Sequence, residues 1–184
     1  MRAPARFRGM RVVIIAAQSL DGFLAKHDKA GTDFTSEADR AWFPACLRSF
    51  DACVMGSETW RVARADIQAA PYSNRRRIVM TRNPAAYADE AKPELIEFTN
   101  EPASELAARL RMEGIEHLAV LGGGVINGLF LEAGLVDEFW ITLEPLVFGE
   151  GRRLAEGKFD VSMSILDVTR LGPDTMLIKY NVKR

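Results

Sequence analysis

Apolar positions in this chain form short runs rich in β-branched residues, and these runs alternate with stretches of helical spacing. Short apolar runs of this composition are typical of buried strands, whereas apolar residues three and four apart indicate amphipathic helices. Strands are predicted at Arg11–Ala17, Ala52–Met55, Arg77–Thr81, Leu95–Thr99, His117–Leu121, Glu138–Leu143, Ile165–Leu171 and Met176–Val182. Helices are predicted at Ser36–Phe50, Glu58–Ala65, Ala103–Glu113 and Val125–Ala133.

The order of these elements predicts the fold class. Strands that alternate with helices need crossover connections, which produce a mostly parallel sheet. The last strands follow one another without a helix, and Gly172-Pro173-Asp174 indicates a hairpin turn between them. We therefore predict an α/β fold with a mostly parallel eight-stranded sheet, an antiparallel C-terminal edge and flanking helices.

Length and composition favour one soluble domain over residues 1–184, with residues 1–10 as a flexible tail. A chain of this length buries about 70 % of its unfolded surface. The net charge of −1 and the pI of about 6.2 give no reason to expect nucleic acid or an anionic membrane as a partner. No apolar stretch approaches the ~20 residues of a membrane span.

The basic start of the chain is not expected to act as a signal peptide, because the apolar run Val12–Ala17 is too short for one. Cys46 and Cys53 match no metal-binding spacing and are interpreted as buried thiols of a reducing, cytoplasmic protein. With only His27 and His117 available, we predict no metal site.

Four junctions that follow predicted strands carry polar residues or glycine, at the sheet edge where open α/β folds bind ligands. Each has a simpler interpretation alone: a turn, a helix cap or a solvated arginine. Together, helix starts and an arginine on one edge suit the phosphates of a dinucleotide. The junctions are Ser19-Leu20-Asp21-Gly22, Met55-Gly56-Ser57-Glu58-Thr59-Trp60, Met80-Thr81-Arg82-Asn83-Pro84 and Gly122-Gly123-Gly124.

A Rossmann dinucleotide site is a weaker alternative for the glycine junction. The spacing Gly122-x-Gly124-x-x-Asn127 lacks the third glycine, and Gly128 falls one place late. The junction also lies late in the chain, whereas the Rossmann fingerprint belongs to the first strand-to-helix turn.

Asp39 is the most informative ionisable residue, and two interpretations of it stay open. On the predicted helix it shares a face with Phe43, Cys46 and Phe50, and an acid beside an apolar stripe has a raised pKa and can deliver a proton near neutral pH. Alternatively, Ser36-Glu37-Ala38-Asp39 is a capping box. Pro44 is predicted to kink or break this helix.

The residues Glu144-Pro145 and Gly149-Glu150-Gly151 are predicted to form a loop after a strand. No chemistry is assigned to this loop.

The chain resembles the dihydrofolate reductase superfamily, and within it the reductase domain of bacterial riboflavin biosynthesis. The resemblance runs from Val12 to Tyr180 and rests on the order and spacing of several motifs. These are Gln18-Ser-Leu-Asp-Gly22, Ser36-Glu-Ala-Asp-Arg40, Met55-Gly56-x-x-Thr59-Trp60, Thr81-Arg82, Leu121-Gly-Gly-Gly, Ala133-Gly-Leu-Val-Asp-Glu138 and Pro145-Leu-Val-Phe-Gly-Glu-Gly151.

The resemblance implies NADPH bound across the carboxyl ends of a dihydrofolate-reductase-like sheet. Thr81 and Arg82 would hold the adenosine 2′-phosphate, and Ala17 and Leu24 would flank the nicotinamide. The other implied cofactor residues face the phosphates from two helix starts: Gly56, Ser57, Thr59, Leu121, Gly122, Gly123, Gly124, Val125, Ile126 and Asn127. Ser57 replaces a basic residue that is usual in folate reductases.

The resemblance also implies a substrate site and an activity. Asp39 would be the substrate-binding acid and proton source, Phe43 would stack on the substrate ring, and Thr142 would hydrogen-bond the acid. We expect an NADPH-dependent reductase that transfers hydride to a C=N bond of a pterin or a riboflavin-pathway pyrimidine, and a homodimer. The alternative is a non-catalytic NADPH-binding homologue, because Leu121 replaces a glutamate that is frequent in the riboflavin branch.

Overall fold

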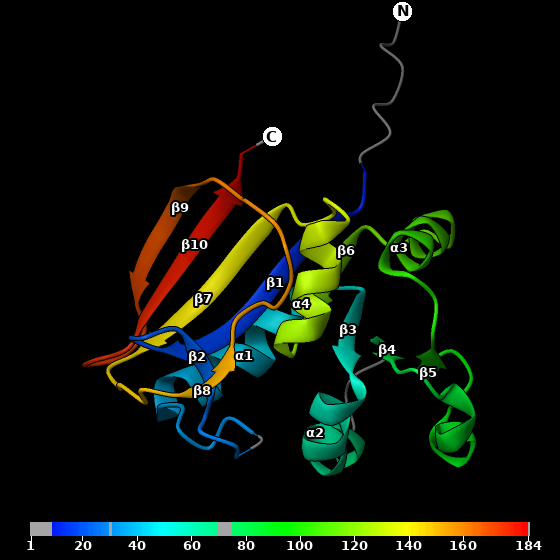
Figure 1. The fold of residues 1–184 in the computed structure, drawn as a ribbon, viewed down its shortest axis with the longest axis horizontal. Coiled ribbons are helices and arrows are strands. Elements are labelled where there is room, and N and C mark those ends of the chain that lie inside the picture. The colour runs from blue at the N-terminus through cyan, green and yellow to red at the C-terminus, as the bar shows by residue number, and fades with distance from the viewer. Residues whose placement is uncertain (1–8, 30, 70–74, 184) are drawn as a thin grey trace, which may run out of the picture.

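The fold is built on one eight-stranded sheet with the strand order β5-β4-β3-β6-β1-β7-β10-β9 (Figure 1). The structure, a computed structural model, describes residues 9–29, 31–69 and 75–183. The strands of this sheet are β1 (Arg11–Ser19), β3 (Ala52–Gly56), β4 (Arg76–Met80), β5 (Ile96–Thr99), β6 (His117–Val120), β7 (Glu138–Glu144), β9 (Met163–Arg170) and β10 (Met176–Val182). The helices are α1 (Glu37–Cys46), α2 (Ser57–Ala69), α3 (Ala103–Met112) and α4 (Gly124–Glu132).

The strand directions confirm the predicted fold class. The six strands from β5 to β7 are parallel, and β10 pairs antiparallel with both β7 and β9. The carboxyl ends of the parallel strands therefore meet at one edge of the sheet. This edge carries all four junctions that the sequence singled out.

Helices cover both faces of the sheet, and alternate side chains of β1 enter the two layers. Val12 and Ile14 pack with residues of α3 and α4, whereas Val13 and Ile15 pack in a second cluster with Trp60 of α2. Figure 1 shows α4 in front of the central strands and α1 behind them. Both faces are thus buried, as a parallel sheet requires.

The helix around Pro44 differs from the prediction. The helix α1 continues past Pro44 to Cys46 and then tightens into the 3-10 turn η1 (Leu47–Ser49). A proline this close to a C-terminus removes only the bond to the Arg40 carbonyl, and the N–H of Leu47 still bonds the Phe43 carbonyl. The predicted single helix to Phe50 is therefore two elements.

The predicted tail needs a correction at its end. Met10 is buried in the core cluster, so it belongs to the folded domain. Residues 1–8 of the predicted tail lie outside the described residues.

Two short strands and a 3-10 segment were not predicted. β2 (Phe23–Lys26) and β8 (Gly151–Arg153) form a separate antiparallel ribbon, and η2 (Pro84–Glu90) follows β4. The ribbon is anchored by Asp21, whose carboxylate accepts hydrogen bonds from the N–H groups of Phe148 and Gly149. No helix among the described residues has the length and apolar character needed to cross a membrane.

Candidate functional site

The sheet has a topological switch point between β3 and β6. The two strands are neighbours, but α2 leaves β3 toward one face and α4 leaves β6 toward the other. Open α/β sheets bind ligands in the crevice that such a divergence creates. The N–H of Gly56 donates to the Gly122 carbonyl at 2.8 Å, which ties the two junctions together at the mouth of this crevice.

The glycine junction is partly exposed at Gly123, whereas Gly122 and Gly124 are buried. Gly122 has a φ of +84°, which favours glycine, and its peptide bond to Gly123 is cis. Of the described atoms, a Cβ added to Gly123 would meet only Oγ1 of Thr59, at 4.0 Å. The first-turn amides of α2 and α4 lack acceptors within their own helices, so the junction suits a phosphate or pyrophosphate.

The residues that begin α4 divide into exposed and interior positions. Val125 is exposed, whereas Ile126 packs in the core. Asn127 is fully buried, its N–H bonds the Gly123 carbonyl at 3.1 Å, and its Nδ2 donates to the Leu154 carbonyl at 2.7 Å. The structure therefore gives Asn127 a supporting position beneath the junction.

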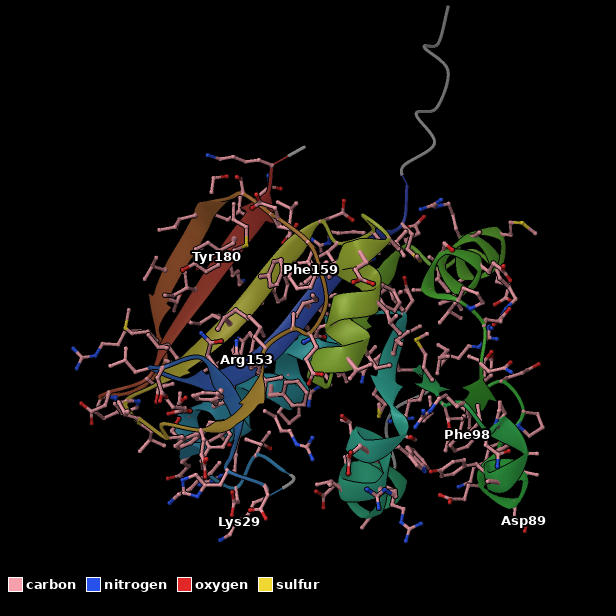
Figure 2. The ribbon with its side chains drawn as sticks, in the orientation of Figure 1. Lys29, Asp89, Phe98, Arg153, Phe159 and Tyr180 are labelled. Atoms are coloured by element: carbon pink, nitrogen blue, oxygen red, sulfur yellow. The ribbon has the colours of Figure 1, made fainter. Side chains whose placement is uncertain are left out.

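The segment after β8 packs directly onto α4. Arg153, labelled in Figure 2, ends β8, and its carbonyl oxygen lies 2.5 Å from the place where a Cβ on Gly124 would stand. A Cβ on Gly128 would overlap the Glu156 carbonyl, and the Glu156 N–H donates to the Gly124 carbonyl at 3.0 Å. Gly124 and Gly128 thus allow the two backbones to touch.

The junction after β4 lies next to the crevice because β4 neighbours β3. Thr81 bonds the Thr99 carbonyl through its N–H at 2.9 Å, and its hydroxyl accepts from the Asn83 N–H at 3.3 Å. Arg82 is exposed and forms no hydrogen bond or ion pair with the other residues that the structure describes. Its guanidinium is therefore available to an anionic ligand.

Asp39 lies on the other side of β1, buried in the first turn of α1 and only 7 % exposed. Burial raises the pKa of its carboxyl, the Thr142 hydroxyl opposes that shift, and the charge of Glu144 adds to it. Thr142 is itself fully buried, although its hydroxyl forms no hydrogen bond of normal geometry among the described residues. The side chains of Asp39 and Thr142 are thus close enough for the Thr142 hydroxyl to affect the pKa of Asp39.

The cap interpretation of Asp39 holds in part. The hydroxyl of Ser36 caps α1 by accepting from the Asp39 N–H at 3.2 Å. The reciprocal bond of a capping box does not come from Asp39, because the Ser36 N–H donates to Oε1 of Glu144 at 2.9 Å. The carboxyl of Asp39 is therefore not used by the cap.

The remaining predicted residues lie on β1, α1 and β2 and directly after β6. Ala17 pairs with Thr142 across β1 and β7 and is half-buried. Phe43 lies one turn after Asp39 and packs against the second core cluster. Leu24 is half-buried on β2, and Leu121 is half-buried after β6, with its N–H bonded to the Val54 carbonyl at 2.8 Å.

Glu144 is a site residue that sequence reasoning missed. It was predicted in a loop but ends β7, where it is 2 % exposed. The available signal was its spacing: residues two apart on a strand face the same side, so Thr142 and Glu144 point toward α1 together.

The two cysteines do not supply a nucleophile. Burial raises the pKa of the Cys46 thiol to about 12 and that of Cys53 to about 11, so both stay protonated near neutral pH. Among the described residues, no group of three or more His, Cys, Asp or Glu side chains is placed to hold a metal ion.

The raised pKa of Asp39 predicts a pH-dependent stability. The native state keeps this proton to higher pH than the unfolded chain, whose aspartic acid titrates at about 3.9. The stabilising contribution is therefore present below that pH and is lost as pH rises through the native pKa. Asp39→Asn should raise Tm relative to wild type by an amount that grows from acid to neutral pH. Circular dichroism melts across that range measure it, and a constant gap would contradict the prediction.

Comparison with known proteins places the chain in a family. It belongs to the RibD C-terminal domain family, which it matches over residues 11–177. It is 30 % identical over 144 residues to the uncharacterized protein YwjB of Bacillus subtilis, covering 77 % of this chain and 80 % of that protein. It is 27 % identical over 213 residues to the 2,5-diamino-6-ribosylamino-4(3H)-pyrimidinone 5′-phosphate reductase of Methanothermobacter thermautotrophicus, covering 94 % and 98 % respectively.

Solved structures share the fold. A diaminohydroxyphosphoribosylaminopyrimidine deaminase/5-amino-6-(5-phosphoribosylamino)uracil reductase from Thermotoga maritima superposes with a TM-score of 0.75 at 16 % identity, over 95 % of this chain and 57 % of that one. Dihydrofolate reductase from Enterococcus faecalis, complexed with NADP(H) and RAB-propyl, superposes with a TM-score of 0.62 at 21 % identity, over 97 % and 99 %. These structures confirm the predicted fold, and the family match confirms the predicted superfamily.

Proposed function

We propose that this protein is an NADPH-dependent reductase that transfers hydride to a C=N bond of a pterin or a pyrimidine-derived heterocycle. The observation that carries the proposal is the topological switch point between β3 and β6, where two helix N-termini meet, with a buried acid across β1. The Methanothermobacter relative, named as a pyrimidinone phosphate reductase, supports the reaction class. The Enterococcus reductase, complexed with NADP(H), supports the cofactor.

The residues around the crevice fit NADPH. The amides that begin α2 and α4 would face the pyrophosphate, and the open side of Gly123 allows close approach of the backbone. Thr81 and Arg82 would hold the 2′-phosphate at the end of β4. Ala17 and Leu24 would flank the nicotinamide, next to the acid on α1.

The reduction adds a hydride to carbon and a proton to nitrogen. The bound cofactor supplies the hydride. Asp39, directly or through one water, delivers the proton, which makes the accepting carbon more electrophilic. Phe43 would stack on the heterocycle, and Thr142 would orient the carboxyl.

Two measurements test this function. Calorimetry or fluorescence should show saturable binding of NADPH to the purified protein. NADPH absorbance should then fall with either dihydrofolate or the riboflavin-pathway ribosylamino-pyrimidine, assayed side by side, and the faster substrate assigns the class. Absence of saturable NADPH binding would reject the proposal.

A non-catalytic NADPH-binding homologue is the second candidate. It is favoured by Ser57 and Leu121, which stand where reductases of these branches carry a basic residue and a glutamate. This candidate predicts tight NADPH binding with no oxidation by any pterin or pyrimidine.

Arg82→Ala tests the proposed phosphate contact. Because a guanidinium–phosphate bond is charge-assisted, its loss should weaken NADPH binding by about 10- to 100-fold and leave NADH binding unchanged. Calorimetric Kd values for both cofactors measure it. Arg111→Ala is the control, since Arg111 is an exposed arginine at the C-terminal end of α3, away from this edge. Equal losses for both cofactors would reject the contact.

We also propose a cytoplasmic homodimer. The apolar segment Phe139–Leu143 and the late antiparallel strands are the candidates for the contact. Within Phe139–Leu143, Phe139 and Ile141 are buried in the domain's own core and are not available to a second copy. Exposed apolar side chains lie on the late antiparallel strand β9, where Ile165 is 63 % exposed and Leu166 is 53 % exposed. Light scattering during gel filtration would show about twice the 20.4 kDa of one chain if a dimer forms.

A further inference from the structure

One carboxylate joins the two loops that lead into the β2–β8 ribbon. Asp21 lies between β1 and β2, whereas Phe148 and Gly149 lie between β7 and β8. Oδ2 of Asp21 accepts from the Phe148 N–H at 3.0 Å and from the Gly149 N–H at 2.7 Å. The main chains add a bond from the Leu20 N–H to the Leu146 carbonyl at 2.7 Å. The two loops are therefore held together mainly by the side chain of Asp21.

The same carboxylate organises the start of β2. The Ser19 hydroxyl donates to Oδ1 of Asp21 at 2.6 Å and accepts from the Phe23 N–H at 3.0 Å. The bond from Ser19, together with those from the main chain, lowers the pKa of Asp21, so its carboxyl group is ionised near neutral pH and only accepts. A chain of hydrogen bonds thus runs from the β7–β8 loop through Asp21 and Ser19 to the first residue of β2.

The segment that follows β8 is fixed at its other end, against α4. The Leu154 carbonyl accepts from Nδ2 of Asn127 at 2.7 Å, and the Glu156 N–H donates to the Gly124 carbonyl at 3.0 Å. The strand β8 with its flanking loops therefore spans the carboxyl edge of the sheet, from the β1–β2 loop to the first turn of α4.

The two strands of the ribbon fit closely, so the position of one sets the position of the other. A Cβ on Gly151 of β8 would overlap the Ala25 carbonyl of β2. The His27 N–H donates to the Glu150 carbonyl at 3.2 Å. Leu24, which precedes Ala25 on β2, is half-buried. Its place relative to the sheet therefore depends on where β8 is held.

We propose that Asp21 is a positioning residue for the reduction: its carboxylate holds the β2–β8 ribbon, and with it Leu24, where the nicotinamide is aligned for hydride transfer. This inference rests on the proposed function, in which Leu24 flanks the nicotinamide. Asp21 is assigned no contact with cofactor or substrate. It acts through the ribbon, because a small misplacement of the reacting groups costs a large factor in rate.

Asp21→Ala removes the acceptor and tests the inference by two measurements. Amide hydrogen exchange, followed by NMR in the ligand-free protein, should become about tenfold faster at Phe148 and Gly149, whose N–H groups lose their partner. Single-turnover hydride transfer from NADPH, with the better of the two substrates, should slow by about tenfold. The Kd for NADPH should stay nearly unchanged, since the cofactor phosphates are assigned to α2, α4 and the end of β4 rather than to the ribbon.

Asp21→Asn separates the hydrogen bonds from the charge. Its amide oxygen can accept from both main-chain N–H groups while its NH₂ faces the Ser19 hydroxyl. Exchange and hydride transfer should therefore stay close to wild type. A loss in Asp21→Asn as large as that in Asp21→Ala would overturn the proposal, because the charge rather than the anchor would then matter.

Asp28→Ala is the matched control. Asp28 is an exposed acid in the turn that follows β2, so the same charge is removed from the same ribbon. Both measurements should match wild type. A slower hydride transfer in Asp28→Ala, equal to that in Asp21→Ala, would also overturn the proposal.

The remaining outcomes separate this inference from the proposed function. If NADPH is oxidised and Asp21→Ala transfers hydride at the wild-type rate, the positioning role is overturned and the function stands. If NADPH is not bound, the function is rejected and the role of Asp21 in hydride transfer falls with it. If Asp21→Ala fails to fold, the wild-type protein decides: Phe148 and Gly149 amides that exchange as fast as unprotected loop amides would overturn the proposal, and protection retained in Asp21→Asn would support it.

Discussion

Asp39→Asn should reduce NADPH oxidation by about 10²- to 10⁴-fold while the Kd for NADPH stays nearly unchanged. The acid is buried on α1 across β1 from the crevice, so it can act on the substrate without contacting the cofactor phosphates. An amide of the same shape has no proton of suitable acidity to donate. Steady-state rates with the better substrate and calorimetric NADPH binding measure the two effects.

Glu37→Gln is the control for Asp39→Asn. Glu37 is an exposed acid in the same first turn of α1, so its neutralisation tests for effects of helix charge alone. It should change the rate by less than about threefold, because its effect is confined to the helix dipole. An unchanged rate in Asp39→Asn would remove the proton-delivery role.

Gly128→Ala should lower the free energy of unfolding by about 3 kcal/mol. Its Cβ would overlap the backbone carbonyl of Glu156, so the segment after β8 must move away from α4. That movement breaks the bond from the Glu156 N–H to the Gly124 carbonyl. It also moves the Leu154 carbonyl away from Asn127, whose buried side-chain NH₂ group then lacks its hydrogen-bond acceptor.

Urea unfolding of wild type and Gly128→Ala measures this loss. Leu129→Ala is the matched control, since Leu129 is the next residue of α4 and is 40 % exposed. It should cost less than about 1 kcal/mol. If Gly128→Ala is as stable as wild type, the contact between α4 and the segment after β8 does not hold the domain together.

The predicted strands were largely correct because a strand buried on both faces is a continuous apolar run, which can be recognised from neighbouring residues alone. Met176–Val182 matches β10 residue for residue, and the strands of the parallel sheet differ by one or two residues at their ends. β2 and β8 were missed because each is very short and pairs only with the other, so neither has a long apolar run.

The sequence indicated the glycine junction of the candidate site but did not indicate Glu144. The glycine junction and the helix starts could be placed because glycine and polar residues after a strand have a local meaning. Glu144 could not, because a charged residue at the end of a strand is usually exposed. Its burial depends on Ser36 and Thr175, which lie 108 and 31 residues away in the chain.

The sequence by itself determined the order and type of the elements, the edge of the sheet where polar residues gather and the acid that stands out on α1. These follow from periodicity and residue type over a few neighbouring positions. Only the tertiary structure decided that Glu144, not Asp39, completes the cap of α1 and that Asn127 and Gly128 support the junction from beneath. Those roles depend on contacts between distant segments, where desolvation and hydrogen bonding act on groups that no local pattern brings together.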